Sequence, residues 1–207
     1  DCMDEVRTNP IIGRETSAEV VLTSRLRDAL KKLNPGRSEE AIEQAIEIIT
    51  SNRGVMSLER ANEGIYKLLK HGVRVMCRDE SGNEEPMTIE VINWSNPLNN
   101  DFLLTSQLWM QGDMYRRRAD LVGFVNGIPL VFIEVKASHK RLRDAFQDNL
   151  RDYKNTIPSL FWYNAFIILS NGSESKIGTI SSGWEHFSEW KRISNEEESG
   201  VVSLETI

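Results

Sequence analysis

The sequence is poor in cysteine and has no long run of apolar residues. Cys2 and Cys77 are the only cysteines among 207 residues, and they lie far outside the spacing of a metal-ligating pair. This excludes a disulfide scaffold and a zinc-finger site. No apolar run approaches the length that spans a membrane, and the N-terminus lacks a signal-peptide pattern. We therefore expect a cytoplasmic protein without a membrane partner.

Two further absences narrow the class of protein. No Gly-X-X-X-X-Gly-Lys-Ser/Thr loop is present, so the chain itself carries no P-loop ATPase. The net charge is -6, which argues against a generic polyanion binder. Basic residues nevertheless gather around one segment: Arg116, Arg117, Arg118, Lys136, Lys140, Arg141 and Arg143. Such a rim can bind phosphate groups locally, although a solvated charge run explains the three arginines about as well.

The first seventy residues show the helical spacing of apolar side chains. Thr16-Ser17-Ala18-Glu19 is a capping-box pattern and predicts the start of a first helix, which ends at Asn34-Pro35-Gly36. Ser38 and Ser57 predict the starts of a second and a third helix. The third should end at His71-Gly72. We expect residues 1–72 to form a helical part that packs on the rest of the chain.

Beyond residue 72, apolar side chains recur at every second residue, which is the spacing of a β-strand. Strands are expected at 73–78, 87–93, 102–109 and 165–170, with a first turn at Ser81-Gly82-Asn83. A helix is expected from about Lys140 to Asn155. This order predicts an α/β fold in which residues 73–207 form a mixed central sheet flanked by helices, with an N-terminal helical layer.

Three charged side chains interrupt two apolar segments that are joined by Asn126-Gly127. Asp120 lies on the first predicted strand, and Glu134 and Lys136 lie on the second. Because they are two residues apart, Glu134 and Lys136 point to the same face. Charge in so apolar a context is costly unless it is paired or holds a metal. For a Glu-X-Lys pattern alone, a surface ion pair on an edge strand is the alternative.

The register of this hairpin decides whether the two acids meet. A strict two-residue turn would pair Asp120 with Ile133 and turn it away from Glu134. One additional residue, such as a G1 bulge with Gly127 in the left-handed conformation, would pair Asp120 with Glu134. If the two acids form one site, we therefore predict a bulge or an odd-length loop here.

With that register the site offers oxygen ligands to a cation. Asp120, one oxygen of Glu134 and the Val135 carbonyl are the hard ligands that Mg²⁺ prefers. The metal would lower the pKa of a bound water and offset charge during phosphodiester hydrolysis. Lys136 would orient that water or neutralise a phosphate oxygen. We predict Mg²⁺ as cofactor and Asp120, Glu134 and Lys136 as catalytic residues.

The pattern Asp120…Glu134-Val-Lys136 resembles the PD-(D/E)XK nuclease superfamily, with Ala119 in place of the proline. From about residue 15 onward the chain also looks like the N-terminal nuclease region of type I restriction enzyme R subunits. The segments that carry this second resemblance are Ile92-Asn93-Trp94, Asn99-Asn100-Asp101-Phe102, Arg118 to Val131 with its Asn-Gly-Ile-Pro-Leu-Val block, and Leu169-Ser170-Asn171-Gly172.

The resemblance implies a restriction-endonuclease-like fold and Mg²⁺-dependent cleavage of double-stranded DNA. ATP would act only through a translocating motor that is absent from this chain, and partner modification and specificity subunits would supply sequence recognition. Arg118, Lys140 and Arg143 are then the expected DNA contacts. Because the chain lacks an initial methionine and ends abruptly after Val-Val-Ser-Leu, we expect a piece of a longer protein. The resemblance implies that the motor lies downstream.

The family often adds a Gln-X-X-X-Tyr motif on the following helix, which here reads Asn149 to Tyr153. Gln147 is the alternative amide, and Tyr153 is equally compatible with helix packing. Glu63 and Glu59 on the third predicted helix are candidates for a further metal ligand, but a solvated helix face explains both as well.

Two other functional interpretations stay open. A Holliday-junction resolvase or repair nuclease would share the fold. A non-catalytic DNA-binding or subunit-docking module would keep the fold without the chemistry, and the intact Asp120, Glu134 and Lys136 argue against it.

Overall fold

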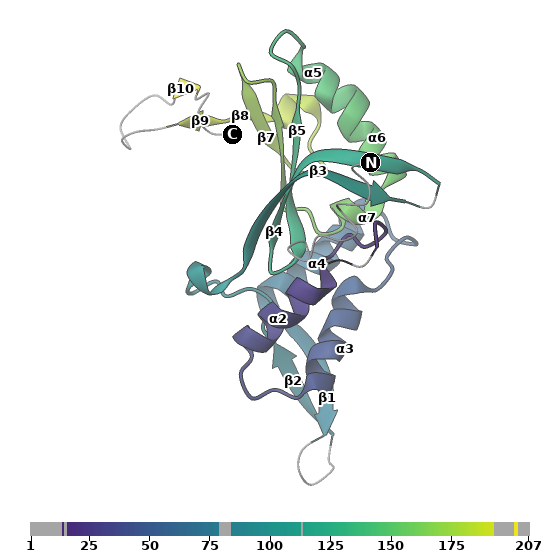
Figure 1. The fold of residues 1–207 in the computed structure, drawn as a ribbon, viewed down its shortest axis with the longest axis vertical. Helices are drawn as coiled ribbons and strands as arrows, with labels where there is room; N and C mark the ends of the chain where they lie inside the picture. Colours follow the sequence, from purple (N-terminus) through teal and green to yellow (C-terminus); the bar gives the residue numbers. More distant parts are fainter. Residues whose placement is uncertain (1–13, 15, 79–83, 113, 193–200, 203–207) are drawn as a thin grey trace.

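The computed structural model describes residues 14, 16–78, 84–112, 114–192 and 201–202, so the expected turn at Ser81-Gly82-Asn83 lies outside the described residues. A mixed six-stranded sheet occupies the upper half of Figure 1, and three helices with a two-stranded hairpin occupy the lower half. Within the described ranges, no helix combines the length and the apolar character needed to cross a membrane.

Four of the five predicted ends of the three N-terminal helices are confirmed. They are α2 (Thr23–Leu33), α3 (Glu39–Thr50) and α4 (Leu58–His71). The hydroxyl of Ser38 accepts a hydrogen bond from the backbone N–H of Ala41, and that of Ser57 accepts one from Arg60. Gly72, with φ of 77°, ends α4 in a conformation that glycine adopts readily. The two serine caps and the glycine stop are therefore confirmed.

The predicted start of the first helix was wrong. Thr16 to Glu19 forms only a turn, and α2 begins at Thr23 without a side-chain cap. The reason is a tertiary contact, because the N–H of Leu22 donates to the carbonyl of Gly127 at 2.8 Å. A Cβ atom on Gly127 would lie 2.5 Å from the carbonyl oxygen of Leu22. This close contact with the turn of the central hairpin holds the segment before α2 out of the helix.

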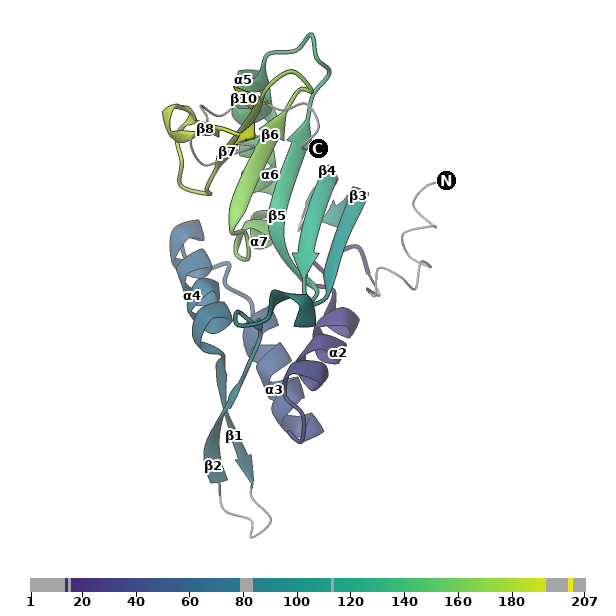
Figure 2. The same ribbon diagram turned by 90° about the vertical axis from the view of Figure 1, so that its left-hand side faces the viewer.

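The first two strands do not join the large sheet. β1 (Val73–Arg78) and β2 (Glu84–Ile89) pair only with each other among the described residues and lie beside α3, away from the main sheet (Figure 2). The expected second strand, 87–93, ends early at Ile89. The side-chain amide of Asn34 bonds both the N–H and the carbonyl of Glu90, at 2.8 and 2.9 Å, in place of a further strand partner. A domain division at residue 72 stays a proposal.

The central sheet has the order β3-β4-β5-β6-β7-β8, and only β5 and β6 run parallel. Its strands are β3 (Phe102–Gln111), β4 (Arg116–Val125), β5 (Ile128–Val135), β6 (Phe166–Ser170), β7 (Ser175–Gly178) and β8 (Ser188–Glu189). The shorter elements are η1 (Pro97–Asn99), α7 (Pro158–Phe161), η3 (Trp184–His186), β9 (Lys191–Arg192) and β10 (Val201–Val202). The fold is thus a mixed α/β architecture, as expected.

One helical segment connects β5 to β6 and covers a face of the sheet (Figure 2). It contains α5 (Leu142–Asp144), the π-helix η2 (Ala145–Leu150) and α6 (Arg151–Thr156), close to the predicted 140–155. Tyr153 of this segment packs on Phe132 of β5, with the two ring centres 5.1 Å apart, and Phe161 of the following α7 lies 5.3 Å from the same ring. This aromatic contact fixes the helical segment against the strands that carry the charged residues.

The predicted irregularity in the β4–β5 hairpin is present, but at a different residue. The turn itself has two residues, Asn126 and Gly127, with φ of 52° and 77°. The pairs from the turn outward are Val125↔Ile128, Phe124↔Pro129, Gly123↔Val131, Val122↔Phe132 and Leu121↔Ile133. Leu130 is therefore the additional residue of a bulge, and the expected shift of one is confirmed.

The bulge occurs at Leu130 because its carbonyl is used outside the hairpin. This oxygen accepts hydrogen bonds from the N–H of Ala165 at 2.7 Å and from the side-chain amide of Asn164 at 3.2 Å. Both donors precede β6. The expected G1 bulge at Gly127 was wrong, because that glycine and Asn126 already form a tight turn of the kind that suits twisted hairpins.

Asn126 offers a direct test of this arrangement. Its buried side chain donates to the carbonyl of Val91 and to Asn100 Oδ1, and accepts from the N–H of Asp101. Asn126→Gly permits the same turn but removes these three bonds, so we expect chemical denaturation to show a loss of about 2–4 kcal/mol in the free energy of unfolding. The exposed Asn155→Ala should stay within about 0.5 kcal/mol. Equal stability of Asn126→Gly and the parent chain would contradict this account.

Candidate functional site

The bulge brings the two acids together across neighbouring strands. Leu121↔Ile133 is the last backbone pair of β4 and β5, so the next positions, Asp120 and Glu134, are opposite each other on one face. The N–H of Val135 donates to Asp120 Oδ2 at 2.9 Å. The Asp120 carboxylate therefore lies against the end of β5, as the sequence predicted.

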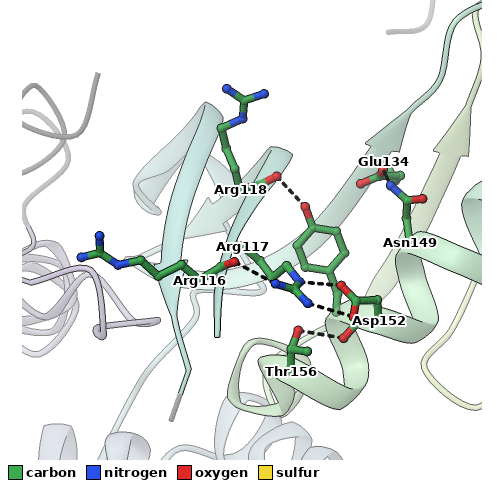
Figure 3. Close-up of polar contacts among 8 residues, drawn as sticks. Arg116, Arg117, Arg118, Glu134, Asn149, Asp152 and Thr156 are labelled. Atoms are coloured by element: carbon green, nitrogen blue, oxygen red, sulfur yellow. Dashed lines mark hydrogen bonds and ion pairs between the residues drawn. The ribbon is translucent and has the colours of Figure 1, made fainter. Parts of the chain in front are cut away.

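Glu134 is the buried acid of the site. It is only 2% exposed, and its Oε1 accepts hydrogen bonds from Lys136 Nζ at 3.2 Å and from the side-chain amide of Asn149. Figure 3 shows Asn149 reaching toward it from the helical segment. Its Oε2 is also buried and has no hydrogen-bond partner among the described residues. A buried carboxylate oxygen without a donor is an electron-rich position that a cation can occupy.

The electrostatics of Asp120 and Glu134 also favour a bound cation. Burial raises the pKa of Glu134, and the negative charge of Asp120 raises it further, while Lys136 and Asn149 oppose that shift. Two carboxylates that disfavour each other's charge are stabilised by a cation between them. The donor set of carboxylate oxygens fits a hard divalent ion such as Mg²⁺.

Among the described residues, a third acid does not join this pair. In the part of the chain that the structure describes, no group of three or more His, Cys, Asp or Glu side chains is placed to hold a metal. Glu63, a candidate from the sequence, lies on the exposed face of α4 and pairs with Lys67 at 2.6 Å. Glu59 is likewise exposed on α4. A solvated helix face therefore describes the surroundings of both side chains, and Glu63 as a metal ligand stays a prediction.

The helical segment supplies one polar residue and one packing residue. Asn149 contacts Glu134, whereas Gln147 is exposed on the π-helix, so the structure brings Asn149 rather than Gln147 to the acids. The hydroxyl of the buried Tyr153 donates to the carbonyl of Arg118. Burial raises the pKa of Tyr153 well above its ordinary value, so this phenol stays a protonated donor. Its contacts are those of a residue that ties the helix to β4.

The three consecutive arginines have different surroundings. Arg117 forms a two-point ion pair with Asp152 of α6, at 2.5 and 3.0 Å, and so holds helix and sheet together. Figure 3 shows the guanidinium groups of Arg116 and Arg118 pointing away from that pair. Arg118 is exposed and lies over the ring of Trp109, 5.7 Å from its centre. Lys140 and Arg143 are also exposed, near the start of the helical segment.

Gln107 of β3 is a polar neighbour that the sequence reasoning missed. Its side-chain amide donates to Asp120 Oδ1 at 3.4 Å, and its φ is 53°, a left-handed value within a strand. The available signal was a glutamine between the apolar stretches of β3. That signal is weak, because exposed polar residues are common in edge strands.

A separate groove lies elsewhere on the molecule. It encloses about 800 Å³ between the segment before α2, the β3–β4 connection and the junction of α6 with α7. Its lining includes Met114, Tyr115 and Trp162 but none of Asp120, Glu134 and Lys136. The candidate site therefore lies outside this groove.

Comparisons with known proteins agree with the resemblance seen in the sequence. The type I restriction enzyme HindI endonuclease subunit of Haemophilus influenzae is 32% identical over 183 residues, which are 87% of this chain and 17% of that protein. The putative type I restriction enzyme MjaIXP endonuclease subunit of Methanocaldococcus jannaschii is 28% identical over 198 residues, which are 93% of this chain and 19% of that protein. This chain thus spans less than a fifth of the length of either relative.

A family model described as the type I restriction enzyme R protein N terminus matches residues 1–186, which is most of the chain. Together with these relatives, that match shows that the chain belongs to the family of type I restriction enzyme R protein N termini.

Proposed function

We propose that this chain is the Mg²⁺-dependent DNA endonuclease domain of a type I restriction enzyme R subunit. The observation that carries the proposal is the Glu134 carboxylate, which is buried and faces Asp120. Lys136 donates a hydrogen bond to one of its oxygens, and no described residue donates to the other. Such a group is stable only if it is protonated or shares its charge with a cation. Metal-assisted phosphodiester hydrolysis uses that combination of acids and an ammonium group.

The fold supports assignment to the PD-(D/E)XK superfamily. In this interpretation Asp120 supplies the first acid from β4, and Glu134 and Val135 at the end of β5, followed directly by Lys136, supply the Glu-X-Lys pattern. The bulge at Leu130 aligns the two strands. A mixed sheet with helices on one face gives these residues a rigid base, which metal ligands require.

Asp120, Glu134 and the main-chain carbonyl of Val135 would hold Mg²⁺. When bound there, this ion lowers the pKa of a water and offsets charge on the phosphate. Lys136, already within 3.2 Å of Glu134 Oε1, can place its ammonium group against a phosphate oxygen or the attacking water. Asn149 holds Glu134 in one rotamer by donating to the same oxygen.

DNA would approach from the exposed side of the site. Arg118, Lys140 and Arg143 are solvent-accessible cations that can contact phosphates of a bound duplex. Phosphate contacts orient a duplex without reading its sequence. We therefore infer that recognition belongs to modification and specificity subunits, and that ATP is used by a motor elsewhere in a longer cytoplasmic protein.

The relatives described above favour restriction over the junction-resolvase and repair-nuclease alternatives, because both carry restriction enzyme names. A non-catalytic module would keep the fold but would have no need of a buried, unpaired carboxylate oxygen. Metal binding separates these possibilities most directly.

The first test is Mn²⁺ binding, followed by isothermal titration calorimetry. Asp120→Asn and Glu134→Gln each remove a negative ligand with little change in shape, so we expect each to weaken Mn²⁺ binding by more than about tenfold. Asp148→Asn, an exposed acid on the neighbouring π-helix, should bind like the parent chain. Unchanged affinity in both site variants would rule out this metal site.

The second test separates Lys136 from the ligands. Lys136→Met keeps both acids, so we expect Mn²⁺ affinity to change little. Mg²⁺-dependent nicking of supercoiled plasmid should slow by about 100-fold or more, because the positive charge next to the phosphate is lost. Lys70→Met, an exposed lysine at the end of α4, is the matched control. Equal nicking rates for Lys136→Met and the parent chain would contradict the assigned role.

The third test concerns the DNA contacts. The triple variant Arg118→Ala, Lys140→Ala and Arg143→Ala removes three exposed charges, so the slope of log Kd against log salt concentration should fall by about three. Fluorescence anisotropy with a labelled duplex measures this slope. Arg37→Ala, on the loop between α2 and α3, should leave it unchanged. A wild-type slope in the triple variant would place the DNA on another surface.

A further inference from the structure

Gln107 occupies the one break in an otherwise regular pairing of β3 with β4. The pairs Ser106↔Leu121 and Leu108↔Ala119 keep the same register on both sides of it. Gln107 is therefore opposite Asp120, yet these two residues do not form a backbone pair. The break is not a slip in register, because nothing is inserted or deleted. It is a local rotation of the strand at this position.

The rotation appears in the backbone angle of Gln107. Its φ of 53° lies in the left-handed region, which glycine, asparagine and aspartate enter far more readily than glutamine. Among the described residues, the other non-glycine with a positive φ is Asn126, which forms a tight turn. A strained conformation within a strand persists only where the surrounding structure requires it, and such positions cluster at functional sites.

The buried residues on either side of Gln107 show the effect of this rotation. Before Gln107 the odd-numbered Thr105 is buried, whereas after it the even-numbered Leu108 and Met110 are buried. In β4 the same change of face occurs between Ala119 and Val122. Both strands therefore exchange their inner and outer faces at the level of Asp120. This leaves Asp120 half-buried at the pivot, where its carboxylate can meet the end of β5.

Both oxygens of the Asp120 carboxylate then have a donor. Oδ2 accepts from the N–H of Val135 on β5, and Oδ1 is 3.4 Å from the side-chain amide of Gln107 on β3. A neutral amide directs the carboxylate without cancelling its charge, whereas a lysine or arginine here would compete with a cation. Hydrogen bonds of this kind to a ligating carboxylate set its orientation and tune metal affinity.

We propose that Gln107 is a positioning residue for Asp120: its left-handed backbone opens the β3–β4 ladder and its amide holds the carboxylate toward the metal site. The inference rests on the proposed function, because it assigns the orientation of a ligand that the function requires. Gln107 touches neither DNA nor metal in this scheme and acts through Asp120 alone.

The test compares two variants that share the loss of the amide but differ in backbone freedom. Gln107→Gly relieves the left-handed strain, whereas Gln107→Ala retains it. We expect both to weaken Mn²⁺ binding by about tenfold or more in calorimetric titration. Their metal-free thermal midpoints should differ, with Gln107→Gly the higher. Gln107→Asn, which tolerates the same φ and retains an amide, should restore part of the affinity.

Gln111→Ala provides the matched control, because this glutamine is exposed on the same strand but bonds Arg116 and Ser17 instead of Asp120. It should bind Mn²⁺ like the parent chain. Wild-type affinity in both Gln107→Ala and Gln107→Gly would overturn the proposal while leaving the metal site intact. If Asp120→Asn also binds like the parent chain, the proposed function fails and the positioning role fails with it.

Discussion

A buried carboxylate in the middle of a β-strand is the constraint on which the rest of this structure depends. Removing the charge of Glu134 from water costs several kcal/mol, and one lysine and one amide on a single oxygen offset only part of that cost. The neighbouring elements surround this group. Asp120 lies opposite it on β4, Asn149 donates to it from the helical segment, and Phe132 lies two residues earlier on the same face of β5. A sheet built for stability alone would carry an apolar side chain here.

The bulge at Leu130 shows how distant parts of the chain decide the geometry of two acids. Its carbonyl is bonded by Asn164 and Ala165, which precede β6, and so the position of β6 determines the register of the β4–β5 hairpin. Without that additional residue, Asp120 would face the opposite side of the sheet. The turn at Asn126 and Gly127 is anchored separately, by Leu22 before α2. The N-terminal helices and the last parallel strand therefore both act on the one hairpin that carries the site.

Much of this could be predicted from the sequence, and the failures share a cause. Ser38, Ser57 and Gly72 mark helix ends by local hydrogen bonds and backbone freedom, and these predictions were confirmed. The two-residue period of a strand showed that Asp120 and Glu134 could meet only with one additional residue in the hairpin, and the structure contains that residue. In contrast, the start of α2, the end of β2 and the place of the bulge depend on Leu22, Asn34 and Leu130 bonding to residues far along the chain. Gln107 was missed because its backbone angle is imposed by neighbouring strands, and the only sign in the sequence is a polar residue between apolar stretches.

The π-helix between Ala145 and Leu150 has a consequence for comparing relatives. Each residue of an ordinary α-helix turns the chain by about 100°, and a wider π turn accommodates one residue more before the helix resumes. Here that additional residue lies within the stretch that carries Asn149, just ahead of Tyr153. In a homologue whose helix lacks this additional residue, a different residue would lie beside the buried acid, while the tyrosine would still pack against the sheet. The residue of such a homologue that is equivalent to Asn149 in space can therefore differ from it by one position along the chain.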